Sequence, residues 1–282
     1  MFTSDRDGDY DIWTMRADGS RLRKLTRNRI EDRCPSWSPN GRWIAFTRRN
    51  VYPPDLLVMR ADGSGLRRVL KLRGTDSCPA WSPDGRRLVF VRMDNTLPTP
   101  VHAVYTVAAN GSALRRLTPL NEAWENADWG RNGRIVFEST YAIEGRINIW
   151  SMRPDGSDRR RLTEAPTESH LHPRWSPDGR RIVFTNNRNG DEELYVMNAD
   201  GSGMKAITDN GLNDWDPGWS PDGRKLVFAR RPEARLRPDG GQPAARDLHR
   251  ERRPLRRAAT HALAPLRQRA RLDPTLVPAH SC

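Results

Sequence analysis

The chain has 282 residues, enough for one large domain or two small ones, and 29% of them are charged against 36% hydrophobic. No apolar run approaches the roughly 20 residues that a membrane-spanning helix needs, and the first residues lack the basic start and apolar stretch of a signal peptide. The formal net charge is +13: residues 232–282 hold 11 arginines and 5 acidic residues and so carry +6, which leaves +7 for the first 231 residues. Three cysteines are too few for a small disulfide-rich domain, and this number does not choose a compartment.

A repeat of 44 to 48 residues runs along the chain, marked by a tryptophan that Ser-Pro-Asp-Gly or Ser-Pro-Asn-Gly follows in most copies. The five tryptophans are Trp37, Trp81, Trp129, Trp175 and Trp219. All six phenylalanines occupy one repeat position: Phe2, Phe46, Phe90, Phe137, Phe184 and Phe228. A second signature, Asp-Gly-Ser or Asn-Gly-Ser, lies between successive tryptophans. A period of this length indicates a repeat architecture.

Each repeat is expected to form four short strands. The first strand ends at the tryptophan, and Ser-Pro-Asp-Gly then turns the chain, because Pro fixes φ and Gly supplies a positive φ. The second strand, as in 87–91 or 181–185, is rich in β-branched and aromatic residues. The third strand is expected at 12–15, 56–59, 104–107, 149–152 and 194–197, and an Asp-Gly or Asn-Gly hairpin then leads to a short fourth strand. In chain order, the complete repeats span about 34–70, 78–118, 126–163 and 172–208.

Four strands in about 40–45 residues, repeated along a chain, predict the blades of an all-β propeller. A solenoid with helices is disfavoured because no stretch shows a helical apolar period. The repeated Trp and Phe side chains are expected to form the core between blades, where truncating one would cost about 3–5 kcal/mol.

Both ends of the repeat pattern are irregular. Phe2-Thr-Ser aligns with the end of a second strand, and the pattern stops after the second strand that ends near Ala229. These leftover strands can combine into one composite blade, which gives a five-bladed ring of four complete blades and one composite blade over residues 1–231. If the tail also supplied strands, a truncated six-bladed ring would result.

On these residues the chain resembles the TolB-like β-propellers, also described as WD-like or PD-type repeats. The resemblance rests on the Trp-Ser-Pro-Asp-Gly turn, the Phe of the second strand and the Met-Asn-Ala-Asp-Gly-Ser hairpin at 197–202, and it covers residues 1–231. It implies a six-bladed propeller, often exported to the periplasm, that serves as a protein-binding platform. Related propellers also cap peptidases of the α/β-hydrolase type.

Residues 232–282 form a second segment of different composition. They contain no Phe, Trp or Tyr and hold 7 of the 22 prolines, which is typical of a disordered tail. Because the change is abrupt and falls within a blade, we interpret the tail as a frameshift product and the start codon as lying inside a longer gene. The alternative is a genuine basic tail that binds nucleic acid or an anionic surface.

One repeat position gives the candidate binding site. The residue three places before each tryptophan reads Cys34, Cys78, Asn126, His172 and Asp216, and we call this set the column. Because the first strand of a blade is innermost, the column should ring the mouth of the central channel. The acids beside it, Asp32, Asp76, Glu125 and Asp214, should make this mouth acidic, whereas the turns of the opposite face are rich in arginine. Such a mouth fits a basic peptide of a partner protein, unless the charges are merely solvated.

Metal and disulfide sites receive less support from the spacing. Zinc needs four ligands at about 2.0–2.3 Å, and no Cys-x-x-Cys pattern supports the column, so we expect no metal and no cofactor. A Cys34–Cys78 disulfide needs Cα atoms within about 7 Å, whereas packed sheets lie about 10 Å apart, so this bond is not expected even though blades converge near the axis. The aspartate-rich segment 5–11 has Tyr10 and Arg16 where a calcium loop needs Gly and Glu, so it is expected to be a turn.

Catalytic signatures such as G-x-S-x-G, H-E-x-x-H, a P-loop or G-x-G-x-x-G do not occur. The sequence therefore predicts a non-catalytic, monomeric scaffold that binds a protein or peptide at the loop face around the channel. Two alternatives stay open: a propeller module of a larger peptidase, and binding of nucleic acid or an anionic surface through the basic face and tail. The resemblance implies a periplasmic protein, and the missing signal peptide leaves the cytoplasm open.

Overall fold

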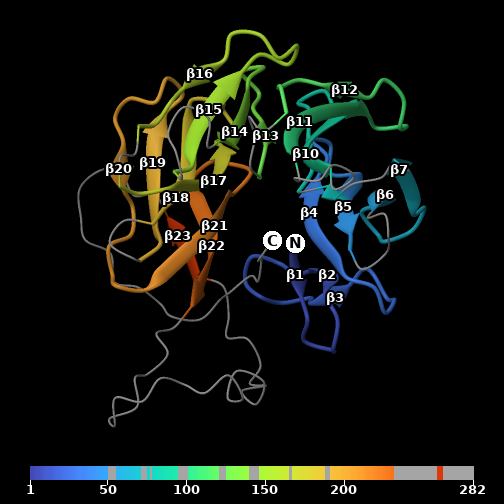
Figure 1. The fold of residues 1–282 in the computed structure, drawn as a ribbon. Coiled ribbons are helices and arrows are strands. Elements are labelled where there is room, and N and C mark those ends of the chain that lie inside the picture. The colour runs from blue at the N-terminus through green and yellow to red at the C-terminus, as the bar shows by residue number, and fades with distance from the viewer. Residues whose placement is uncertain are drawn as a thin grey trace, which may run out of the picture.

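The computed structural model describes residues 1–49, 55–70, 75–76, 78–94, 101–120, 125–139, 146–164, 167–187, 191–231 and 259–262. All regular structure in these residues is β-strand, in six antiparallel sheets that follow one another around a central axis (Figure 1). The expected all-β propeller is therefore confirmed. This part of the chain contains no helix that could cross a membrane.

We number the sheets as blades 1 to 6 in chain order. Blade 1 contains β1 (Phe2–Ser4), β2 (Asp11–Thr14) and β3 (Arg23–Lys24). Blade 2 contains β4 (Asp32–Trp37), β5 (Trp43–Arg48), β6 (Asp55–Arg60) and β7 (Arg67–Leu70). Blade 3 contains β8 (Thr75–Asp76), β9 (Ala80–Trp81), β10 (Arg87–Asp94), β11 (Val101–Ala108) and β12 (Arg115–Arg116). Blade 4 contains β13 (Asp128–Trp129), β14 (Ile135–Ser139), β15 (Asn148–Met152) and β16 (Arg160–Arg161). Blade 5 contains β17 (His170–Trp175), β18 (Arg181–Asn186), β19 (Glu193–Asn198) and β20 (Lys205–Ala206), and blade 6 contains β21 (Asn213–Trp219), β22 (Lys225–Arg231) and β23 (Ala259–Ala262).

Blades 2 to 5 are the four complete blades that the repeat predicts. Within each of them, strands that are consecutive in the chain pair as antiparallel neighbours. In blade 3 the innermost strand is divided into β8 and β9, and both parts pair with β10. Each blade packs on the next through its first strand, as β4 contacts β9 and β17 contacts β21.

The two terminal blades have three strands each. β1 pairs with β2, and β22 pairs with β23, so the strands of the two ends do not merge into a composite blade. Four complete and two incomplete blades correspond to the second arrangement expected from the sequence, a truncated six-bladed ring. Residues 232–258 and 263–282 lie outside the described residues, so the division into a propeller and a disordered tail stays a prediction.

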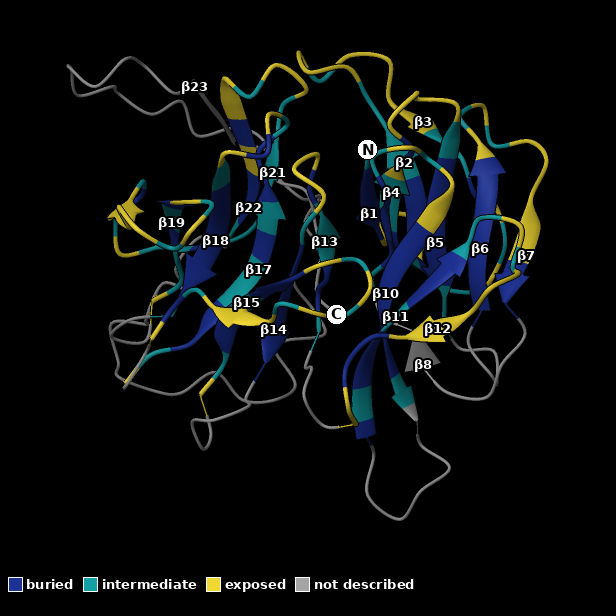
Figure 2. Cartoon of the chain, turned by 90° about the horizontal axis from the view of Figure 1, so that it is seen from above, coloured by how far each residue is buried: buried dark blue, intermediate teal, exposed yellow. Residues whose placement is uncertain are grey.

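The repeated phenylalanines form the core of the blades. All six are at most 3% exposed, and Figure 2 shows buried residues along β5, β10 and β18, with exposed residues at the turns. The repeated tryptophans link neighbouring blades, because the Trp81 indole donates to the Ser36 carbonyl and the Trp219 indole donates to the Arg174 carbonyl. Trp81 is 6% exposed, whereas Trp37 is 41% exposed. The inner strand that would cover Trp37 is absent from blade 1 as described.

Two structural constraints favour glycine at the middle position of the Asp-Gly-Ser and Asn-Gly-Ser signature. Its φ is positive, as at Gly111 (90°) and Gly201 (90°), which suits a residue without a side chain. It also approaches the preceding blade: a β-carbon would lie 2.2 Å from the Val69 carbonyl oxygen at Gly111 and 2.4 Å from the Leu162 carbonyl oxygen at Gly201. The signature therefore serves both the hairpin and the contact between blades.

Candidate channel site

The column residues lie at a bend in the innermost strands. Cys34, Asn126, His172 and Asp216 have φ values of 53°, 47°, 53° and 53°, in the left-handed region that residues other than glycine seldom adopt. The strand register shifts at this position in β4, β17 and β21, which defines a β-bulge. Strained backbone of this kind persists where the surrounding structure holds it, and it is concentrated at functional sites.

A proline follows four of the five column residues, as in Cys34-Pro35 and His172-Pro173. Proline has no N–H to give to a strand ladder, so it is tolerated in a sheet at an edge or a bulge. The Cys34-Pro35, His172-Pro173 and Asp216-Pro217 pairs thus suit the bulges of β4, β17 and β21, whereas Asn126 adopts the same backbone conformation with Ala127 after it.

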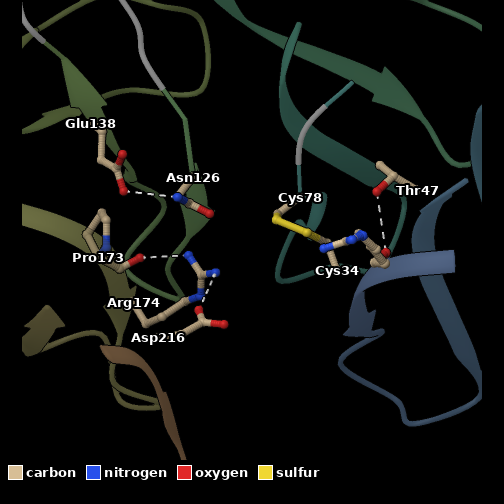
Figure 3. Close-up of a disulfide and its surroundings, with 9 residues drawn as sticks. Cys34, Thr47, Cys78, Asn126, Glu138, Pro173, Arg174 and Asp216 are labelled. Carbon is tan, nitrogen blue, oxygen red and sulfur yellow. Dashed lines mark hydrogen bonds and ion pairs between the residues drawn. A yellow bond between two sulfur atoms is a disulfide. The ribbon is translucent and has the colours of Figure 1, made fainter. Parts of the chain in front are cut away.

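Cys34 and Cys78 form a disulfide across blades 2 and 3, with Cα atoms 4.8 Å apart. The expectation from the average spacing of packed sheets was therefore wrong. The spacing of about 10 Å applies to sheet faces, whereas these cysteines lie where the inner strands of neighbouring blades converge. The disulfide closes one side of the channel (Figure 3).

A small cavity of about 150 Å³ lies at this end of the channel. The disulfide borders one side, and Asp128, Arg174 and Asp216 border the other, as Figure 3 shows for Arg174 and Asp216. Arg174 donates to the Pro173 carbonyl at 3.0 Å, and its guanidinium lies 3.9 Å from the Asp216 carboxylate. The structure thus places three of the five column residues around one cavity.

The other two column residues meet at a buried carboxylate. Oε1 of Glu138 accepts hydrogen bonds from the backbone N–H of His172 at 2.6 Å and from the Asn126 side chain at 3.1 Å. Burial raises the pKa of Glu138 to about 8, and the nearby Glu125 adds to the rise, while the two hydrogen bonds oppose it. Glu138 therefore ties blade 4 to the bulge of blade 5.

Two further carboxyl groups near the channel are also perturbed. Asp128 Oδ2 accepts a hydrogen bond from the Trp175 N–H at 2.8 Å. Burial raises the pKa of Asp128, and Arg174 opposes this rise. Burial also raises the pKa of Glu125, a half-buried residue for which Arg49 and His102 have the opposite effect.

Two of the predicted acids point inward rather than to the surface. Asp32 and Asp214 have no exposed area, and each accepts two hydrogen bonds from an arginine on the neighbouring strand, Arg48 or Arg230, at 2.5–2.9 Å. The backbone of Asp76 pairs with Arg92, and its side chain lies outside the described part of the chain. Among the described side chains, Asp128, Arg174 and Asp216 line the cavity at the channel, whereas Asp32 and Asp214 are buried against arginines.

Sequence reasoning missed Glu138, Asp128 and Arg174. The repeat contains a signal for each of them. Glu138 stands at the position after the phenylalanine, where the other repeats have Thr, Val or Ala. Asp128 and Arg174 stand just before the tryptophan, where the other repeats have Ser, Ala or Gly.

One group of potential metal ligands occurs among the described residues, and it lies away from the channel. Asp7, Asp9 and Asp11 bring their carboxylate oxygens within 4.8 Å of one another in blade 1. The Lys24 ammonium lies 2.5 Å from both Asp7 and Asp11, so a cation of this chain already neutralises the group.

Comparison with known proteins agrees with the repeat analysis. The family model of the TolB beta propeller domain (PD40) matches residues 31–170 and 166–235. A protein TolB homolog from Chlorobium luteolum is 30% identical over 199 residues, which cover 70% of this chain and 33% of that protein. A Tol-Pal system protein TolB from Syntrophus aciditrophicus is 43% identical over 53 residues, 19% of this chain and 12% of that protein. The chain thus spans about a third or less of the length of these relatives.

Solved structures share the fold at low identity. TolB from Acinetobacter baumannii superposes with a TM-score of 0.69 at 19% identity, covering 79% of this chain and 55% of that one. Enzymes also use this architecture: an oligogalacturonate lyase in complex with manganese gives a TM-score of 0.61 at 15% identity, covering 83% and 68%. Because the family model matches more than half of the sequence, the chain belongs to the TolB β-propeller family.

Proposed function

We propose that this protein is a non-catalytic propeller that binds a segment of a partner protein at the channel mouth. The observation that supports this most strongly is the cavity bordered by the Cys34–Cys78 disulfide on one side and by Asp128, Arg174 and Asp216 on the other. A set of strained bulges from different blades holds these groups in place. Rigid scaffolds that present loops around a channel commonly bind other proteins.

The charges favour a cationic group as the part of the partner that enters the cavity. The lining contains two carboxyl groups and one guanidinium, and the buried Glu138 lies nearby. A cation close to Asp128 or Glu138 would lower the raised pKa values of these groups and pair with the carboxylates. A volume of about 150 Å³ suits one lysine or arginine side chain, or a chain terminus.

The disulfide supports a location outside the cytoplasm. Structural disulfides persist in oxidising compartments and are rare where thiol reductants act. We therefore propose a periplasmic or otherwise extracytoplasmic protein, with a protein rather than a nucleic acid as its partner.

The test is titration calorimetry with an acetylated, amidated Gly-Arg-Gly-Arg-Gly peptide. Asp216→Asn removes one charge and keeps a residue type that tolerates positive φ, so the bulge is retained. The expected result is binding by the wild type and at least a fivefold weaker affinity for the variant. Asp222→Asn is the matched control, because Asp222 is an exposed acid of the same blade in the turn between β21 and β22. Equal affinities for the wild type and both variants would remove the channel from the proposal.

A further inference from the structure

The turn between β13 and β14 in blade 4 is one residue shorter than its counterparts. In blade 3, the Ser82 N–H donates to the Arg87 carbonyl five residues later, and blades 2, 5 and 6 close their turns with the same spacing. In blade 4 the Gly130 N–H donates to the Arg134 carbonyl four residues later. The third tryptophan motif, Trp129-Gly-Arg-Asn-Gly, is also the one that lacks Ser-Pro.

The shorter turn changes the contact with the preceding blade. At two other junctions the turn glycine lies over the proline of the preceding turn, because a β-carbon would be 3.7 Å from Pro39 at Gly85 and 3.6 Å from Pro177 at Gly223. A β-carbon at Gly133 would meet nothing within 4 Å. The glycine–proline contact of the other two junctions is therefore missing here, and a groove of about 420 Å³, lined in part by the half-buried Pro83, lies between blades 3 and 4.

The groove combines an apolar floor with a basic rim. Trp129, Pro83 and Pro154 supply the apolar surface. The exposed side chains of Arg86, Arg87 and Arg131 supply the positive charge.

Asp84 is the acidic residue of the lining, and it has partners of its own. It accepts hydrogen bonds from Ser82 Oγ at 2.5 Å and from the Arg86 N–H at 3.0 Å, which hold its pKa below the ordinary range. At the junction of blades 5 and 6, the equivalent arginine is used internally, since the Arg181 guanidinium stacks over the Trp219 ring at 5.0 Å. No such stacking occurs between Arg87 and Trp129, both of which are described, so these two groups remain available to a ligand.

We propose that this groove binds an acidic peptide segment of a partner protein, with an aromatic or aliphatic side chain between two carboxylates. Three guanidinium groups face one carboxylate that is already bonded, so the lining carries a net positive charge. Arginine pairs with carboxylates through two parallel hydrogen bonds, and the Trp129 ring offers a surface for an apolar side chain. The site is distinct from the channel and independent of its proposed role.

The test is fluorescence anisotropy with fluorescein-labelled Glu-Glu-Phe-Glu-Glu at 150 mM salt. Two variants remove the site in different ways. Arg87→Glu with Arg131→Glu reverses the charge of the rim. Replacing residues 130–134 by the six-residue Ser-Pro-Asp-Gly-Arg-Arg turn of blade 5 gives the turn its usual length and brings a glycine to the position that contacts the preceding proline at the other junctions. Arg42→Glu with Arg180→Glu is the matched control, since both are exposed turn arginines outside the groove and the change in net charge is the same.

Both groove variants are expected to bind the peptide at least tenfold more weakly, with the control within twofold of the wild type. Thermal melting by circular dichroism shows that the variants are folded. The proposal is overturned if the wild type does not bind, or if the control loses as much affinity as the charge-reversed groove. It is also overturned if a Gln-Gln-Phe-Gln-Gln probe binds equally well, or if a 20-nucleotide DNA competes at the groove more strongly than the peptide does.

Discussion

Replacement of two tryptophans at the same repeat position should have very different effects on stability. Trp81 is 6% exposed and its indole donates to the Ser36 carbonyl at 3.1 Å, whereas Trp37 is 41% exposed. For a tryptophan side chain of about 250 Å², this difference in exposure corresponds to about 90 Å² of buried surface. At about 25 cal/mol per Å², that surface contributes about 2 kcal/mol of hydrophobic stabilisation. The hydrogen bond contributes about 1 kcal/mol more. Trp81→Ala should therefore destabilise the fold by about 4 kcal/mol, and Trp37→Ala by about 1 kcal/mol.

The assay is urea unfolding followed by far-ultraviolet circular dichroism, because each variant loses a fluorophore. The slope of the transition should stay the same if both variants keep the same native surface. Equal losses of stability would refute the reasoning, since they would mean that Trp37 is covered as fully as Trp81. A larger loss for Trp37 would contradict the three-stranded blade 1.

Three further results are expected. Asp32→Ala leaves the largely buried Arg48 guanidinium without its carboxylate. The variant should lower the free energy of unfolding, measured in urea, by about 3–5 kcal/mol. Adding Arg48→Met should recover part of that loss rather than add to it. The pKa of Glu138 is raised from 4.5 to about 8, so its contribution to stability is full below pH 4.5 and is lost as the pH rises through 8. Glu138→Gln should therefore reduce the decrease in unfolding free energy between pH 5 and pH 8. An unchanged pH profile would exclude Glu138 as the cause of that decrease. Gly111→Ala places a β-carbon 2.2 Å from the Val69 carbonyl oxygen, whereas the β-carbon of Gly133→Ala meets no atom within 4 Å and adds only the strain of a positive φ. Gly111→Ala should therefore lower the melting temperature much more than Gly133→Ala. Similar decreases would contradict the contact between blades at Gly111.

The fold could be predicted because the residues that build it recur at fixed positions. The buried Phe46 and Phe90 and the hairpin glycine Gly111 have equivalents in other blades that make the same packing contacts, so the sequence shows these residue types as a repeat. The way the ends pair could not be predicted. It depends on whether β22 meets β2 or another strand, and the pattern after Arg231 contains no repeat to indicate this.

The repeat singles out the column residues, and their role as a binding site stays a prediction; the contacts around them could be predicted only in part. The repeat did not indicate that Cys34, His172 and Asp216 lie at β-bulges, nor that the inner strands bring Cys34 and Cys78 closer than average sheet spacing allows. The arginine partners of the acids follow from strand register: Asp32 faces Arg48 across the ladder. A comparison of the repeats would have found this pair, because blade 6 has Asp214 and Arg230 at the same two places, whereas blade 5 has His170 and Asn186 there.

Comparing equivalent positions of the repeats distinguishes residues that stabilise the fold from residues that have a role in binding. A position needed only for folding should carry the same kind of residue in blades 2 to 5, because these complete blades share the same arrangement of paired strands. Blade 4 departs from this pattern twice, with Glu138 in place of a smaller residue and with a shorter turn whose glycine does not contact the preceding blade. Both departures are unfavourable for the fold, since one buries a carboxyl group and the other opens a groove between blades. Departures of this kind mark functional sites in proteins whose other positions obey the local rules. Blade 4 contributes to the channel cavity through Asp128 and to the arginine-rimmed groove through Trp129, so two neighbouring residues of β13 border two different candidate sites.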